Sequence, residues 1–443
     1  MEPLRIGIDG FNLAMSNGTG VATYGLQLVR TLKTMGHRTE GVFGVSVGKD
    51  AANREVNFFD NCQRPPDPKK RIPKWQRRAE FLRSLVDQTA YEVPLTDKVE
   101  KAGFAERLPD FDRLVSADAL FDRAHTHFKV RNRFLRLRMD NPPPIMHWTY
   151  PVPIVLEGSR NIYTLHDLVP LKLPYATLDD KDFYRGIVAG CAREAAHICT
   201  VSEASRADIH HLLDVPLDRI SNTYQIGASG LAASPAEDDA RAVEGIFGLK
   251  ADGYFLFFGA IEPKKNIGRI IEAYLSMQTA TPLVIVGARS WQADEELKLM
   301  PGGGADGGVG TFVGHRGQTI IRLSYMPRDL LAKLIRGARA VLFPSLYEGF
   351  GLPVQESMQV GTPVITSNVS SLPELAGDAA ITVDPYDVPG LVTAMRRVDE
   401  DEALRRDLGA RGMVQAGTFS QEAYRGRLAA MYDVVMTRKA AGA

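Results

Sequence analysis

Cysteine is rare in this sequence, and neither sign of charge is in excess. The three cysteines, Cys62, Cys191 and Cys199, are too few and too far apart for a disulfide framework or a zinc site. The 53 basic and 53 acidic residues give a formal net charge of zero. Proteins that bind nucleic acid by neutralising phosphates usually carry a basic excess, so we expect no nucleic-acid partner.

Long apolar segments are also missing. The longest run, at 254–261, has the length of a buried strand and falls well short of the roughly 18–20 residues that cross a bilayer. The first eight residues lack the basic-then-apolar layout of a secretory signal. With reduced cysteines, these absences predict a cytoplasmic protein. The 44% hydrophobic and 24% charged residues are typical of a globular chain.

Short apolar runs alternate with segments of helical periodicity, which predicts an α/β fold with parallel sheets. Strands are predicted at 4–9, 161–166, 197–202, 254–261, 282–287, 320–325, 340–344, 363–367 and 380–384, and helices at 21–35, 266–277, 328–338, 353–360 and 388–399. The small, polar stretch 230–245 suits a linker. We therefore predict two βαβ-type domains, at 1–232 and 245–418, and a final helix within 419–443.

The segment from about 62 to 150 interrupts this alternation and is read as a basic insertion. Its basic residues are Arg64, Lys69, Lys70, Arg71, Lys74, Arg77, Arg78 and Arg83, followed by Lys129, Arg131, Arg133, Arg136 and Arg138. Trp75, Phe81, Phe128 and Phe134 interleave these charges. Two interpretations stay open: a solvated helical face, or a surface for anionic lipid headgroups or an anionic acceptor.

Two glutamates, Glu348 and Glu356, bracket a turn with two glycines in the segment 343–364. Pro353 is placed to open the helix that follows the turn. Glycine lets backbone N–H groups approach a ligand closely, and a helix N-terminus favours an anion such as pyrophosphate. Carboxylates on either side suit hydroxyls of a sugar and a ribose. Taken alone, Glu356 could simply interact with the helix dipole in a first turn.

This segment, Pro-Ser-Leu-Tyr-Glu-Gly-Phe-Gly-Leu-Pro with the second glutamate eight positions after the first, resembles the signature of retaining glycosyltransferases of family 4. The downstream sequences Gly-Thr-Pro-Val-Ile-Thr-Ser-Asn, Leu-Pro-Glu-Leu and Val-Asp-Pro are similar to that family as well. The resemblance covers 250–390 and, more thinly, 1–30 and 160–230. It implies a GT-B fold, with two Rossmann-like domains whose parallel sheets face an interdomain cleft. It also implies a C-terminal helix that crosses back to the N-terminal domain.

The resemblance implies that the C-terminal domain holds a nucleotide sugar and the N-terminal domain the acceptor. Glu348 would then contact the donor sugar and Glu356 the ribose. Backbone N–H groups of Phe350, Gly351 and Leu352 would meet the sugar or the diphosphate.

Three further positions match the family. Lys264 and Lys265, after a predicted strand, match a basic pair that binds the pyrophosphate, although many members carry an additional arginine where this sequence has alanine. Gly18 and Gly20 match a glycine loop that approaches the donor phosphate. His166, at a predicted strand end, matches a histidine near the transferred sugar, whereas a lone histidine is more often structural.

The expected activity is a retaining, metal-independent glycosyl transfer with His166, Lys265 and Glu348 as catalytic residues. Neither Asp-x-Asp nor His-Glu-x-x-His occurs, so we expect no metal cofactor. The sequences around Lys265 and Glu348 resemble those of mannosyltransferases. We therefore expect GDP-mannose as donor, a glycan or lipid-linked glycan as acceptor, and a place in surface-polysaccharide assembly at the inner face of the membrane.

Two other functions stay open. The chain could be a catalytically silent GT-B scaffold that binds a sugar nucleotide or a polysaccharide. An NAD-dependent oxidoreductase is the less favoured alternative, because the G-x-G-x-x-G fingerprint is absent.

Overall fold

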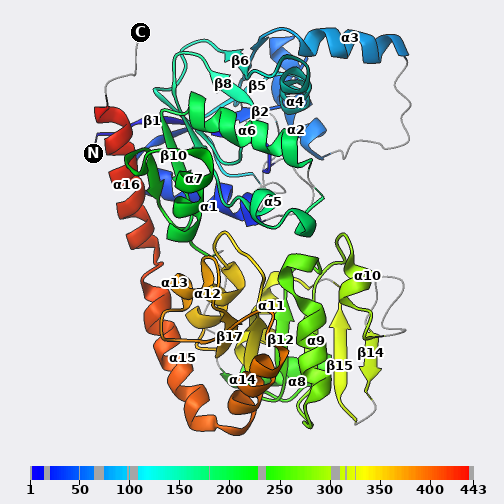
Figure 1. The fold of residues 1–443 in the computed structure, drawn as a ribbon. Coiled ribbons are helices and arrows are strands. Elements are labelled where there is room, and N and C mark those ends of the chain that lie inside the picture. The colour runs from blue at the N-terminus through cyan, green and yellow to red at the C-terminus, as the bar shows by residue number, and fades with distance from the viewer. Residues whose placement is uncertain are drawn as a thin grey trace.

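The computed structural model describes residues 2–13, 20–48, 50–63, 74–96, 99, 108–178, 180–227, 236–300, 310–314, 317–324 and 326–438. Within these ranges the chain forms two large sheets, each flanked by helices, and Figure 1 shows one sheet above the other. Nearly all neighbouring strands are parallel. The predicted α/β class with parallel sheets is confirmed.

The first sheet has eight strands in the order β11-β10-β9-β7-β1-β2-β5-β4, and only the β4–β5 pair is antiparallel. Its strands are β1 (Arg5–Asp9), β2 (Arg38–Phe43), β4 (Tyr91–Val93), β5 (Arg113–Ser116), β7 (Ile145–Trp148), β9 (Arg160–Thr164), β10 (His197–Thr200) and β11 (Ile220–Asn222). A small parallel sheet holds β3 (Gln88–Thr89), β6 (Leu135–Arg138) and β8 (Ile154–Leu156).

The helices of this half are α1 (Gly20–Thr34), α2 (Arg54–Gln63), α3 (Lys74–Ser84), α4 (Leu120–Arg131), α5 (Val169–Lys172), α6 (Lys181–Glu194) and α7 (Glu203–Leu213). Ser202 caps α7 as its sequence position predicts, because its side-chain oxygen accepts a hydrogen bond from the Ser205 N–H at 3.0 Å.

The second sheet has seven strands in the order β14-β15-β13-β12-β16-β17-β18. They are β12 (Phe255–Phe258), β13 (Leu283–Val286), β14 (Gly310–Val313), β15 (Thr319–Leu323), β16 (Ala340–Phe343), β17 (Val364–Ser367) and β18 (Ile381–Val383). The helices are α8 (Ala236–Phe247), α9 (Ile267–Ser276), α10 (Ala293–Glu296), α11 (Arg328–Gly337), α12 (Leu352–Gln359), α13 (Leu372–Ala376) and α14 (Val388–Glu400). Every residue of β12, β13 and β16 is buried, which explains their continuous apolar sequences.

Two sequence predictions differ from the structure. The presumed insertion at 62–150 supplies strands β4, β5 and β7 of the first sheet, so much of it belongs to the fold itself. The phenylalanines of its second basic cluster, Phe128 and Phe134, lie in the core rather than between exposed charges. Part of the predicted linker, 236–245, belongs to α8, whose first turn carries three acidic residues that favour a helix N-terminus. Residues 228–235 lie outside the described ranges.

Two long helices complete the chain, α15 (Glu402–Gly417) and α16 (Gln421–Thr437). Figure 1 shows α15 beside the second sheet and α16 beside the first. The buried residues of α16 are Tyr424, Leu428, Met431, Tyr432 and Val435, at the spacing of one helix face. Ser420 caps this helix by accepting a hydrogen bond from the Ala423 N–H. None of the helices in the described part of the chain is long and apolar enough to cross a bilayer.

Candidate active site

The predicted site residues follow the carboxyl ends of strands in both sheets. His166 follows β9, Lys265 follows β12 and Glu348 follows β16. In α/β folds this edge is where ligands bind. The two sets of loops meet at Gly349, where a Cβ atom would lie 2.6 Å from the backbone oxygen of His166. Only glycine allows this approach, so the glutamate loop of the second sheet packs directly against the histidine loop of the first.

Lys265 and Glu348 form an ion pair inside this contact region. The Lys265 Nζ lies 2.6 Å from Glu348 Oε1, and both side chains are largely buried. The same ammonium group lies 5.0 Å from the centre of the Phe343 ring. The Glu348 N–H donates to Ser370 Oγ at 3.0 Å, which fixes the start of the loop. Two residues expected to act on one donor are therefore in direct contact.

Lys264 faces a set of carboxylates. Burial alone would lower the pKa of Lys264, but the nearby carboxylates of Glu348, Asp167 and Glu262 raise it well above its usual value. The nearest of them, Glu262, has its Oε1 atom 3.5 Å from Lys264 Nζ. Lys264 is therefore a permanent cation at the edge where the two sets of loops meet.

Asn266 holds this basic loop in place. The 3₁₀ turn η5 (Pro263–Lys265) ends at Asn266, whose φ of 63° is left-handed. Asparagine tolerates that conformation better than most residues. Its side-chain amide donates to the carbonyl oxygens of Pro344, at 2.9 Å, and Pro385, at 2.7 Å. Sequence reasoning assigned no role to Asn266. Its partners are 78 and 119 residues away, so no local pattern indicates them.

His166 is held in one tautomer. Its Nε2 lies 2.9 Å from the Thr149 carbonyl oxygen. A carbonyl oxygen only accepts, so Nε2 carries the hydrogen. Burial lowers the pKa of His166, which favours the neutral ring with an unprotonated Nδ1. The ring packs edge-on against Tyr24 with centroids 4.8 Å apart.

Glu356 is paired with a residue that sequence reasoning missed. Arg328, the first residue of α11, places its Nη2 2.6 Å from Glu356 Oε1. The carboxylate is 6% exposed and the arginine side chain 43% exposed. Because α12 begins at Leu352, Glu356 lies beyond the first turn, where the dipole effect is weak. The helix-dipole explanation of this glutamate is therefore corrected.

The turn between the glutamates needs its second glycine. Gly351 has a φ of 109°, and a Cβ there would lie 2.7 Å from the Leu372 side chain. Phe350 is buried, and its ring packs 5.6 Å from that of Phe419. Leu352 opens α12, one residue before Pro353 rather than at it, so its N–H is one of the helix's unbonded N-terminal donors.

The glycine loop of the first sheet approaches this helix start. A Cβ on Gly20 would lie 4.0 Å from the Leu352 side chain. Gly20 opens α1, so the N-terminal ends of α1 and α12 lie close together. Gly18 lies outside the described residues.

Further residues join the two halves of the molecule around the site. Glu374 of α13 accepts hydrogen bonds from the Glu203 and Ala204 N–H groups at the start of α7, at 2.9 and 3.0 Å. Tyr347, which precedes Glu348, donates its hydroxyl hydrogen to Asp208. Asp208 also pairs with Lys172 at 2.8 Å. These contacts hold the loops of the two sheets against each other.

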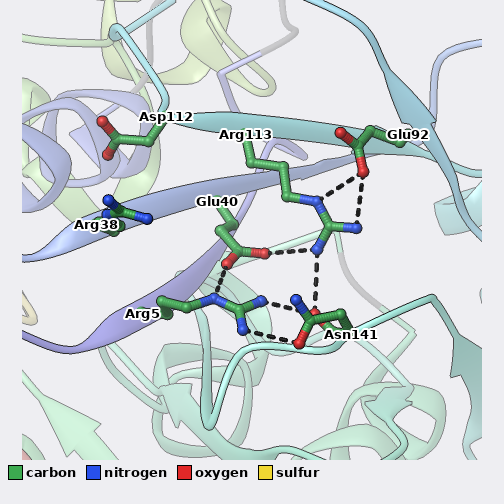
Figure 2. A pocket seen from close by; sticks show the side chains of 7 residues that line it. All are labelled: Arg5, Arg38, Glu40, Glu92, Asp112, Arg113 and Asn141. Carbon is green, nitrogen blue, oxygen red and sulfur yellow. Dashed lines mark hydrogen bonds and ion pairs between the residues drawn. The ribbon is translucent and has the colours of Figure 1, made fainter.

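A cavity of about 630 Å³ lies at the opposite edge of the first sheet, away from these residues. Arg5, Arg38 and Arg113 begin the strands β1, β2 and β5 there. Figure 2 shows the Glu40 carboxylate between two of these arginines, 2.7 Å from Arg5 and 3.1 Å from Arg113. Its position at the amino ends of the strands, and the pairing of these charges, indicate a structural role.

The candidate site therefore brings together cations, carboxylates and two helix N-termini between two parallel sheets. The cations and free N–H groups suit a diphosphate, and the carboxylates suit sugar hydroxyls. Over the described residues, no group of three His, Cys, Asp or Glu side chains is arranged to hold a metal ion. Metal independence stays a prediction.

Comparison with solved structures identifies the class. Sucrose-phosphate synthase from Thermosynechococcus elongatus superimposes with a TM-score of 0.66 at 18% identity, over 98% of this chain and 99% of that one. Anabaena HepE, solved in complex with UDP-glucose, gives a TM-score of 0.60 at 14% identity, over 97% and 99%. The chain has the GT-B fold, as predicted.

Sequence comparison then identifies the family. The family described as "Glycosyl transferases group 1" matches residues 252–401. O-antigen chain mannosyltransferase B of Escherichia coli is 36% identical over 270 residues, which cover 60% of this chain and 68% of that protein. The chain belongs to the group 1 glycosyltransferases. The alternative of an NAD-dependent oxidoreductase is wrong.

Proposed function

We propose that this glycosyltransferase moves mannose from GDP-mannose to a glycan or lipid-linked glycan during surface-polysaccharide assembly, with retention of anomeric configuration and without a metal ion. The Escherichia coli relative is a mannosyltransferase, which supports mannose as the transferred sugar. We further propose that the reaction takes place at the inner face of the membrane, with the protein bound at its surface.

The observation that carries this proposal is the buried ion pair between Lys265 and Glu348, at 2.6 Å, in a loop that touches the backbone of His166. A carboxylate held in this way is ready to accept hydrogen bonds from sugar hydroxyls. Lys264, Lys265 and the N-terminus of α12 supply positive charge where the diphosphate departs. Lys265 and Glu348 match the family motif independently, and their contact in space supports a shared role.

Retention is proposed to proceed by attack on the same face of the sugar. The bond between the sugar C1 and the diphosphate oxygen breaks, and a bond forms between C1 and the acceptor hydroxyl oxygen. The hydroxyl proton passes to the departing phosphate. Burial lowers the pKa of His166 and so makes its unprotonated Nδ1 a weak base, which favours a role in positioning the sugar rather than in taking that proton.

The experiment is a panel of GDP-mannose, UDP-glucose and ADP-glucose with a mannose oligosaccharide acceptor, with and without EDTA. We expect transfer from GDP-mannose alone, unchanged by EDTA, and an α-linked product in NMR. A β-linked product would contradict retention. Donor binding without turnover for any acceptor would favour the silent scaffold that the sequence left open.

A further inference from the structure

Two solvent-exposed tyrosines from opposite halves of the molecule contact each other at the surface. Tyr175 lies in the 3₁₀ turn η3 (Pro174–Ala176), and Tyr386 lies in the turn between β18 and α14. Their hydroxyl oxygens are 3.0 Å apart. Tyr175 is 61% exposed and Tyr386 53% exposed, so most of both rings faces solvent. Ordinary packing does not explain this pair, because it buries little of either side chain.

Both tyrosines are tied to the candidate active site through short segments. Tyr386 follows Pro385, whose carbonyl oxygen accepts a hydrogen bond from Asn266, the neighbour of Lys265, at 2.7 Å. Tyr175 follows α5, which begins three residues after His166 and whose Val169 N–H donates to the side chain of Asp167 at 3.1 Å. The pair therefore lies at the edge of the contact region that holds His166 and Lys265.

The Tyr386 ring is held on one side. The guanidinium carbon of Arg269 lies 4.9 Å from the ring centre, and Arg269 Nη1 donates to Asn266 Oδ1 at 2.7 Å. A ring fixed by a cation on one face presents its other face in a defined direction. Tyrosine combines a flat apolar face with a polar tip, which suits a ligand that has both.

We propose that Tyr175 and Tyr386 form a platform that binds a neutral sugar residue of the glycan acceptor. The apolar C–H face of a pyranose would lie on the aromatic faces, and its hydroxyls would meet the phenolic oxygens. This inference rests on the proposed function for the identity of the sugar. The cations of the site serve the diphosphate, whereas an uncharged acceptor needs apolar contact and hydrogen bonds from its own subsite. A platform built from both halves would bind the acceptor only when the halves are together.

The test measures binding of α-linked mannotetraose to the full chain in the presence of GDP, by calorimetry. Tyr175→Ala and Tyr386→Ala should each weaken binding by about tenfold, the size of effect expected for one lost aromatic contact. Tyr175→Phe and Tyr386→Phe keep the rings and lose the link between hydroxyls, so they should retain most of the affinity. The matched control is Tyr91→Ala, because Tyr91 is also about half exposed and also lies beside an arginine, Arg54, at 5.1 Å.

The outcomes separate this inference from the proposed function. Phenylalanine variants that bind as weakly as the alanine variants would show that the hydrogen bond between the two hydroxyl groups matters and the rings do not. That result would overturn the platform. Unchanged binding in the alanine variants, or no binding by the unaltered protein, would overturn it too. Mannotetraose binding that depends on the tyrosines, in a protein that transfers no mannose, would support the platform and contradict the proposed function.

Discussion

At the scale of single residues, the motif glutamate Glu356 is paired with Arg328, a residue that lies far from it in the sequence. The carboxylate is buried while its arginine is nearly half exposed, so a ligand hydroxyl reaching the carboxylate would meet the arginine as well. The glutamate could be found from its motif. The arginine could not, because it lies 28 positions away in the sequence and in a different helix.

Glu356→Gln tests the role assigned to this carboxylate. The variant keeps the shape of the side chain and loses charge-assisted hydrogen bonds, each worth about 1.5–3 kcal/mol. We expect affinity for GDP-mannose to fall by about tenfold or more in calorimetry, with the fold retained. An unchanged dissociation constant would exclude contact with the donor. Arg328→Gln is the companion variant, expected to weaken donor binding less because the carboxylate remains.

Lys265→Ala separates leaving-group stabilisation from simple docking. Positive charge matters most where negative charge develops, so kcat should fall by about 10²-fold with a smaller change in KM. Steady-state kinetics with GDP-mannose measure both constants. Lys265→Arg, which keeps the charge beside Glu348, should recover part of kcat. A rise in KM with kcat intact would assign Lys265 to ground-state binding alone.

His197 makes stability depend on pH. Burial, and then the charges of Arg438 and Arg219, lower the pKa of His197 from 6.5 to about 4. Below pH 6.5 the unfolded chain therefore binds a proton that the folded chain does not. The free energy of unfolding should fall as pH drops from 6.5 towards 4, by up to about 1.4 kcal/mol per pH unit from this group.

His197→Gln keeps a partner for Ser221, which lies 2.8 Å from His197 Nε2, and removes the titration. Urea unfolding at pH 7.5, 6.5 and 5.5 measures the free energy of unfolding of both proteins. As the pH falls, this free energy should decrease less for the variant than for the unaltered protein. Parallel curves for the two proteins would contradict the assignment.

At the scale of secondary structure, apolar periodicity predicted the elements that bury large side chains. Strands β12, β13 and β16 and helices α9 and α11 lie within a few residues of their predicted positions. Helix α15 gave no such signal, because its buried residues are Leu408, Gly409, Gly412 and Ala416, three of them small. Strands β4, β5 and β7, of three or four residues each, were hidden within the arginine-rich segment.

Helix α3 is the element that carries the membrane prediction. Trp75 is 68% exposed and Leu82 63% exposed, beside the exposed Arg77 and Arg78. Apolar and basic side chains exposed on one short helix suit an anionic bilayer surface. Lys69, Lys70 and Arg71 of the same basic cluster lie outside the described residues.

Replacing Arg77, Arg78 and Arg83 by glutamine should reduce sedimentation with phosphatidylglycerol vesicles, and added salt should weaken binding of the unaltered protein. The control variant removes the same charge from Lys129, Arg131 and Arg133, whose neighbouring phenylalanines are buried. Equal loss in both variants would indicate a general charge effect, and no loss in either would contradict the membrane prediction.

At the scale of the whole molecule, the last helix joins the two halves. Tyr432 of α16 hydrogen-bonds His147 Nδ1 in the first sheet at 2.7 Å. Arg160, which begins β9, donates to the carbonyl oxygen of Met436 at 2.6 Å. The apolar stripe of α16 could be predicted from its own sequence. Its contacts with the first sheet are 276 and 285 residues away in the chain, so their prediction came only from the family resemblance.

Truncation after Gly417 should expose the surface of the first sheet that α16 covers and should abolish most transferase activity. Loss of five buried side chains should also lower the unfolding temperature. Activity and thermal unfolding of the truncated protein measure this. Tyr432→Phe is the milder control, expected to keep the stripe and most of the activity. Full activity with an unchanged unfolding profile would show that 418–443 is dispensable.

The bond between Tyr432 and His147 also has a consequence for the order of synthesis. His147 Nε2 lies 2.8 Å from Thr164 Oγ1, Thr164 contacts Tyr24, and the Tyr24 ring packs against His166. Tyr432 is made 285 residues after His147, a delay of about 15 to 60 s at ordinary rates of translation. Throughout that interval the series of contacts that ends at His166 lacks its last member, Tyr432. A growing chain would therefore complete the packing around His166 only after its last helix has been synthesised.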